Sequence, residues 1–148
     1  MERASHSGRR MAVMILVGLS MAACADKATK SEGDHKAAQV ETVKGTELGR
    51  VKLTSDAARR LDIQMEPVVA NGGGEGTRIP YGAVLYDPEG NTWAFVNVNA
   101  LTFLRAPINV DHIDGDVAFL SDGPPVGTQV VKVGAAELYG AEIGVGDE

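Results

Sequence analysis

Turn-forming residues recur at short intervals along the second half of the chain and leave room only for short strands between them. Pro88 and Gly90 occupy the constrained positions of a turn at residues 87–91. Asp114 and Gly115 form a strong short-hairpin signal, and the Asp-Gly-Pro-Pro sequence at 122–125 interrupts the next run. This pattern predicts a mostly β domain, a small antiparallel barrel or sandwich with one or two short helices.

The runs between the turns carry the β-branched and aromatic residues typical of strands. We expect strands at residues 50–53, 81–86, 92–98, 108–112, 116–120 and 129–133, and an extended segment at 63–69 that Pro67 interrupts. A short helix at 56–61 would be capped by Thr54 or Ser55, and one helical turn at 134–139 would end at Gly140. Residues 71–76 contain too much glycine for regular structure and predict a mobile connection.

Length and composition exclude several classes of protein. A chain of 148 residues favours one small domain. The single cysteine, Cys24, rules out an intramolecular disulfide framework. A net charge of −6 argues against a nucleic-acid partner, because binding to phosphates needs clustered Lys and Arg.

The first 23 residues have the pattern of an export signal. Arg3, Arg9 and Arg10 precede an uncharged, mostly apolar run at 11–23, which is too short to span a membrane as a helix. The run ends in Met-Ala-Ala before Cys24 and resembles the lipobox of bacterial lipoproteins, with Met21 where that motif prefers Leu. The resemblance implies cleavage before Cys24, attachment of lipid to this residue and anchoring in a membrane of the cell envelope, on its periplasmic side or on the outer face of the cell membrane. The alternative is an ordinary secretory signal that leaves Cys24 as a free thiol.

Residues 24–48 show no apolar periodicity and predict a flexible tether from Cys24, followed by a β domain at 49–148. The charges are unevenly distributed along the mature chain. Residues 24–60 hold eight basic and six acidic residues, whereas residues 61–148 hold three basic and 13 acidic ones. The basic part is nearest the anchor, where anionic lipid headgroups would attract it; the alternative is a solvated linker.

The order of packing and turn residues over roughly 50–143 resembles the membrane-proximal region of periplasmic adaptors, the membrane fusion proteins of RND-type efflux systems. The matching positions are Val51, Leu53, Leu61, Ile63, Pro67, Pro80, Ala83, Val84, Gly90, Trp93, Val96, Arg105, Ile108, Val110, Gly115, Val117, Phe119, Gly123, Gly127, Val130, Val131, Gly134, Ala135 and Leu138. The lipoyl domain and helical hairpin of those adaptors are absent, and residues 71–76 stand in their place. The resemblance implies a non-enzymatic accessory protein that docks on a membrane transporter.

The polar residues match no catalytic or metal-binding template. The Asp-rich segment 111–116 fails as a calcium loop, because Ile113 occupies an acidic position and Gly115 comes one position early. His112 could find only His35 as a second imidazole in the mature chain, so a zinc site is not expected. Ser121 has the residue types of a triad near it but none of the glycines of a nucleophile elbow. We therefore predict neither an enzyme, nor a metal site, nor a cofactor.

Three aromatic residues remain as candidates for contact with a ligand or partner: Trp93, Phe95 and Phe103. The other interpretation is that they form the core of the β domain, as the largest apolar residues of a small domain usually do. The alternative to transporter docking is accordingly a surface lipoprotein that binds a small ligand in a β pocket.

Overall fold

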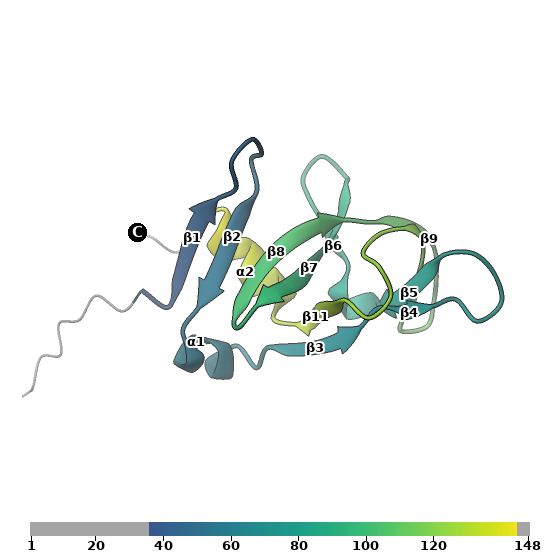
Figure 1. The fold of residues 1–148 in the computed structure, drawn as a ribbon, viewed down its shortest axis with the longest axis horizontal. Coiled ribbons are helices and arrows are strands. Elements are labelled where there is room, and N and C mark those ends of the chain that lie inside the picture. Colours follow the sequence, from purple (N-terminus) through teal and green to yellow (C-terminus); the bar gives the residue numbers. More distant parts are fainter. Residues whose placement is uncertain (1–35, 145–148) are drawn as a thin grey trace, which may run out of the picture. The chain divides into compact units, whose positions relative to one another are not determined.

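Two antiparallel sheets form the body of the protein. The computed structural model describes residues 36–144. The seven-stranded sheet has the order β1 (Ala38–Thr42), β2 (Gly49–Leu53), β8 (Thr102–Pro107), β7 (Thr92–Asn99), β11 (Gln129–Val133) and β3 (Gln64–Pro67), with β6 (Leu85–Tyr86) paired to β7. The four-stranded sheet has the order β4 (Val69–Ala70), β5 (Thr77–Pro80), β10 (Val117–Asp122) and β9 (Asn109–Asp114). The sheets stack without closing into a barrel, so the predicted fold class is confirmed in its sandwich form (Figure 1).

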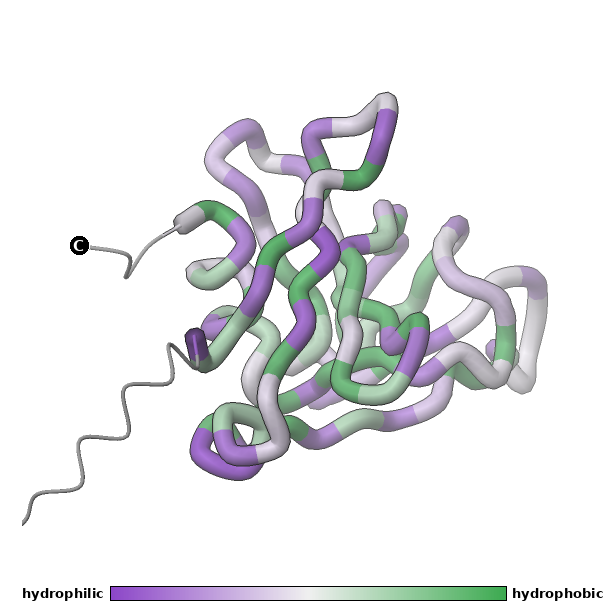
Figure 2. The backbone as a smooth tube through the Cα atoms, turned by 60° about the vertical axis from the view of Figure 1, so that its left-hand side comes forward, coloured by the Kyte–Doolittle hydropathy of each residue, from purple (hydrophilic) through white to green (hydrophobic). Residues whose placement is uncertain are grey.

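The core consists of two clusters on opposite faces of the seven-stranded sheet. Along β7, Ala94 and Val96 pack toward the four-stranded sheet, while Phe95 packs toward the other face. That other face is covered by two helices, α1 (Ser55–Arg60) and α2 (Ala135–Glu142), which contribute Ala57 and Leu138 to the second cluster. Figure 2 shows the alternation of hydrophobic and hydrophilic residues along the strands.

Strand β1 differs from the expected tether. Residues 38–42 lie within the 24–48 segment but pair in antiparallel register with β2, with Val40 opposite Val51. The backbone of Thr54 also donates to the carbonyl of Ala37 at 3.1 Å. Val40 remains 44% exposed, so the strand is held by its backbone pairing rather than by burial of side chains, and it leaves no hydrophobic pattern in the sequence. The earlier part of the expected tether, Cys24 and the signal segment lie outside the described residues.

The first helix is confirmed and the second is longer than expected. Thr54 caps α1, because its side-chain oxygen accepts from the backbone N–H of Ala57 at 3.2 Å. Helix α2 runs through Gly140 to Glu142, so the prediction of a stop at Gly140 is wrong. The last turn of α2 is retained by the side chain of Glu142, which binds to the seven-stranded sheet.

The strand predictions fail at three places. Residues 81–83, expected in a strand, form a 3-10 turn, η1 (Tyr81–Ala83). Strands β5 and β8 are absent from the expectations and appear in the structure. The glycine-rich segment 71–76 closes a hairpin between β4 and β5, in which the N–H of Asn71 donates to the carbonyl of Gly76 at 3.1 Å.

Candidate functional site

The chain changes sheets at Val68, and this transition opens a groove between the two sheets. β3 pairs with β11 in the seven-stranded sheet, whereas β4 pairs with β5 in the four-stranded sheet. Val68 between them is fully buried, and its N–H and carbonyl bond to the carbonyl of Thr128 and the N–H of Gly127, each at 2.8 Å. The two strand segments are therefore fixed at the crossing point, and β3 and β5, which belong to different sheets, both line the groove.

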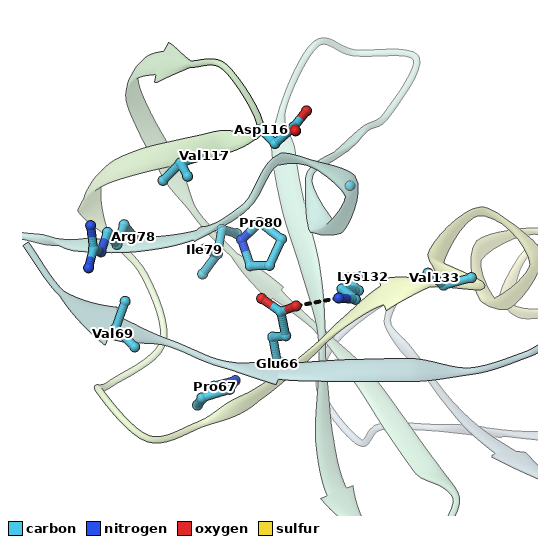
Figure 3. A pocket seen from close by; sticks show the side chains of 11 residues that line it. Glu66, Pro67, Val69, Arg78, Ile79, Pro80, Asp116, Val117, Lys132 and Val133 are labelled. Carbon is cyan, nitrogen blue, oxygen red and sulfur yellow. Dashed lines mark hydrogen bonds and ion pairs between the residues drawn. The ribbon is translucent and has the colours of Figure 1, made fainter.

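The groove has a volume of about 650 Å³. Its walls come from β3, β4, β5, η1, β10 and β11, and much of the lining is apolar (Figure 3). The apolar lining residues are Pro67, Val69, Ile79, Pro80, Val117 and Val133, with Gly82 beside them. Val69 and Val133 are 36% and 37% exposed, so part of the apolar lining is open to solvent.

Four charged residues complete the lining. Glu66 on β3 forms an ion pair and hydrogen bond with Lys132 on β11, between side chains that remain 45% and 32% exposed. Figure 3 shows this pair at the centre of the groove and Arg78 and Asp116 at its margin. Among the residues placed around the groove there is no serine, cysteine or histidine. The arrangement offers an apolar surface with a central, accessible ion pair, which suits binding of an amphipathic segment or molecule.

The three aromatic residues predicted as contacts lie away from this groove. Phe95 and Phe103 are fully buried in the core cluster that faces the helices. Trp93 is half-buried, and its indole N–H donates to Asp87 at 2.9 Å. The groove was missed because Glu66 and Lys132 are brought together only by the pairing of β3 with β11, and nothing in the sequence around either residue indicates that pairing.

Trp93 belongs instead to a structural cluster around Arg105. The guanidinium of Arg105 lies 4.8 Å from the centre of the Trp93 ring and 5.0 Å from that of Tyr139. Its Nε is 2.5 Å from a carboxylate oxygen of Glu142. The cluster fixes α2 to the sheet through cation–π and ionic contacts.

Asp87 holds the turn at 87–91 together with Trp93. Its carboxylate accepts from the backbone N–H and the side-chain amide of Asn91, at 2.7 and 2.8 Å, and from the indole of Trp93. Partial desolvation raises the pKa of Asp87, but the hydrogen bonds from Asn91, Trp93 and the backbone N–H of Glu89 outweigh it and leave the pKa below its ordinary value.

The Asp-rich segment forms the β9–β10 hairpin. Gly115 adopts a φ of 56° in the turn, as the hairpin signal predicts. The ring of His112 stacks on Phe119 at 4.4 Å between centroids, and its Nδ1 lies 2.8 Å from a carboxylate oxygen of Asp111. The hydroxyl of Ser121 is directed to the backbone carbonyl of Asn109 at 3.4 Å. Within residues 36–144, no group of three or more His, Cys, Asp or Glu side chains is positioned to hold a metal ion.

Cys24, the predicted lipidation site, lies outside the described residues. Over the part of the chain that the structure covers, no helix has the length and apolarity to cross a membrane. No family model matches the chain, and neither curated proteins nor solved structures give a significant match.

Proposed function

We propose that this chain is a non-enzymatic, lipid-anchored accessory protein of the cell envelope whose β domain docks on a membrane transporter. The observation that carries the proposal is the open groove between the sheets, with its apolar lining and its central Glu66–Lys132 pair. The resemblance of the chain to the membrane-proximal region of efflux adaptors and the lipobox-like sequence before Cys24 supply the membrane context.

The position of β1 limits how far the docking surface lies from the membrane. Fourteen residue steps separate Cys24 from Ala38, the first residue of β1. A fully extended chain covers at most about 3.5 Å per residue, so this connection reaches no more than about 50 Å. A domain that began only at residue 49 would lie on a much longer tether, so the paired β1 strand favours a partner close to the membrane surface.

The groove supplies two elements of a protein interface. Val69 and Val133 expose apolar surface whose burial would favour association. The ion pair of Glu66 with Lys132 offers one acceptor and one donor at a fixed place, which would set the register of a bound segment.

A small ligand is the second candidate for the same groove. The volume of the groove, about 650 Å³, lies within the roughly 300–1,000 Å³ typical of small-molecule sites. On this alternative the chain is a surface lipoprotein that binds a metabolite between Glu66, Lys132 and the valines.

Site-specific photocrosslinking in cells distinguishes the two candidates. A photoreactive amino acid at Val69 or Val133 is expected to crosslink to an integral membrane transport protein, identified by mass spectrometry. The control is the same substitution at Tyr86, which is 53% exposed on β6 and is not part of the groove. Equal crosslinking from all three positions, or no protein adduct from the groove, would contradict docking through this surface; a metabolite-dependent shift of the melting temperature would then favour the ligand alternative.

A charge-reversal series tests the ion pair itself. Lys132→Glu places two carboxylates side by side and should reduce crosslinking to the partner. Combining it with Glu66→Lys restores a pair of opposite charges, and we expect this double variant to recover the fold of the groove but not the full yield of the adduct.

A further inference from the structure

The charges of the described domain are divided between its two ends. Residues 36–62 contain six basic and four acidic residues, whereas residues 63–144 contain three basic and ten acidic ones. Strands β1 and β2 and helix α1 lie at one end of the domain, and strands β4, β5 and β9 lie at the other (Figure 1). Most of the separation along the sequence is therefore also a separation in space. The exception is α2, which packs against β1 and β2 and brings Glu137 and the Arg105-paired Glu142 to the first end.

We call the first region the basic end; its cations are Lys36, Lys44, Arg50, Lys52, Arg59 and Arg60, all of them exposed. Two of them are compensated locally, since Arg50 lies 3.8 Å from Glu41 and Arg59 pairs with Asp56. Among the described residues, neither Lys52 nor Arg60 has a carboxylate within ion-pair distance.

Three of these cations lie around α1 and the residues that precede it. Lys36 and Lys52 line one surface hollow together with Thr54 and Ser55. Arg60 lines a neighbouring hollow that shares Thr54 and Ser55 with the first. Lys36 just before β1, Lys52 on β2 and Arg60 on α1 thus contribute to one concentration of positive charge, in which Asp56 is the acidic residue.

The opposite end of the domain carries exposed acidic residues. Asp111, Asp114 and Asp116 are exposed on or beside the β9–β10 hairpin, and Asp122 follows at the end of β10. An anionic surface would repel this end and attract the basic end, so the domain has a preferred orientation in front of such a surface.

We infer that the basic end binds the anionic phospholipid headgroups of a membrane surface, and that the acidic end points away from it. The charge complementarity carries the inference, and the chain enters the domain through β1 at this same end. The inference adds an orientation to the proposed function, but the lipid contact itself does not depend on Cys24 being lipidated. Because the cations are exposed, salt should weaken the contact strongly.

The test measures energy transfer from Trp93, the single tryptophan, to a fluorescent headgroup in vesicles. Protein purified from the cell envelope is mixed with vesicles of phosphatidylcholine alone or with phosphatidylglycerol added. We expect more transfer with the anionic lipid and a return to the neutral-lipid level at high salt, whether or not the protein carries an anchor. Equal energy transfer with the two lipids would overturn the inference. If instead Cys24 carries no lipid, the protein would show no binding to the neutral vesicles, which is a separate outcome.

Matched charge reversals locate the contact. Lys52→Glu on β2 should lower the salt-sensitive binding to anionic vesicles, and adding Arg60→Glu should lower it further, by about thirtyfold or more in all. Arg78→Glu makes the same change of charge on β5, at the other end of the domain, and should have little effect. Equal losses from Lys52→Glu and Arg78→Glu would mean that net charge alone governs binding and would overturn the proposed orientation. Circular dichroism of each variant confirms that the fold is retained.

Discussion

The side chains of Arg105 and Glu142 form an ion pair that joins the C-terminal helix to the middle of the seven-stranded sheet. Nε of Arg105 on β8 lies 2.5 Å from Oε2 of Glu142, the last residue of α2. The side chains are only 11% and 3% exposed. The second oxygen of Glu142 accepts from the backbone N–H of Gly49 on β2 at 2.8 Å, so one carboxylate holds three elements that are distant in sequence.

Removing this carboxylate should destabilise the fold strongly. Glu142→Ala leaves the charge of Arg105 buried without a partner, and we expect a loss of about 3–5 kcal/mol in the free energy of unfolding. Urea titration followed by circular dichroism measures the loss.

Two further variants separate charge from general helix effects. Glu137→Ala, at an exposed position of the same helix, should change stability by less than about 0.5 kcal/mol. Replacing both Arg105 and Glu142 by apolar residues should cost less than the sum of the two single truncations, because neither charge is then left unpaired. Strict additivity would show that the two side chains are not coupled.

The Arg105 position also explains why β8 could not be predicted. Phe103 and Arg105 point to the same face of the sheet. The alternation of a half-buried strand predicts an apolar residue at position 105, where the chain has an arginine. The charge is tolerated there because the guanidinium lies over the rings of Trp93 and Tyr139 and Glu142 neutralises it. These contacts are tertiary, so the local pattern of residues carries no sign of them.

Turn chemistry, in contrast, could be predicted from the sequence. The hairpins at 87–91 and 114–115 follow from residues whose backbone preferences are local, and Gly90 and Gly115 both have positive φ in the structure. The groove depends on Glu66 and Lys132, 66 residues apart, and on the change of sheet at Val68. Long-range strand pairing of this kind is set by the whole core. Most of the turns could therefore be predicted from the sequence, whereas the candidate site could not.

Gly76 should be intolerant of a side chain although it belongs to a glycine-rich loop. Its φ is +94°, and a Cβ atom there would lie 2.3 Å from the backbone carbonyl oxygen of Leu120 on β10. The neighbouring strand cannot move aside cheaply, so we expect Gly76→Ala to cost at least about 1–3 kcal/mol in unfolding free energy.

Gly72 in the same loop provides the matched control. A Cβ atom there meets nothing within 4 Å, and its φ is outside the left-handed region. Gly72→Ala should therefore be neutral or stabilise the domain by up to about 1 kcal/mol, through a reduced entropy of the unfolded chain. Similar losses for both variants in thermal unfolding would contradict the close approach of Gly76 to β10.

Acid should weaken the turn that Asp87 organises. Because the pKa of Asp87 is lower in the folded protein than in the unfolded chain, the carboxylate stabilises the fold above the unfolded value of about 3.9. This contribution is lost as the pH falls through the lower folded-state pKa. Asp87→Asn should therefore show a smaller decrease in stability than the parent between about pH 5 and pH 2.

Trp93 reports the protonation of Asp87 directly, since its indole N–H donates to the Asp87 carboxylate. Its fluorescence should change over this acid range in the parent and not in Asp87→Asn. Glu89→Gln, in the same turn, is the control and should behave like the parent. A fluorescence transition that persists in Asp87→Asn would assign the change to another group.

The last prediction concerns β1, where structure and sequence expectation differ most. Residues 38–42 bond to β2 along five paired positions, although four of the five side chains are exposed. A flexible tether would exchange its amide hydrogens rapidly, whereas a paired strand protects every second amide on its bonded side. In hydrogen exchange followed by mass spectrometry, peptides that cover residues 38–42 should therefore exchange more slowly than peptides from the 72–75 loop. Val40→Pro removes a backbone N–H and restricts the strand, and it should abolish the protection of these residues while leaving that of β7 intact. Protection at 38–42 no greater than in the loop would restore the longer tether and remove the limit of about 50 Å on the distance between Cys24 and the folded domain.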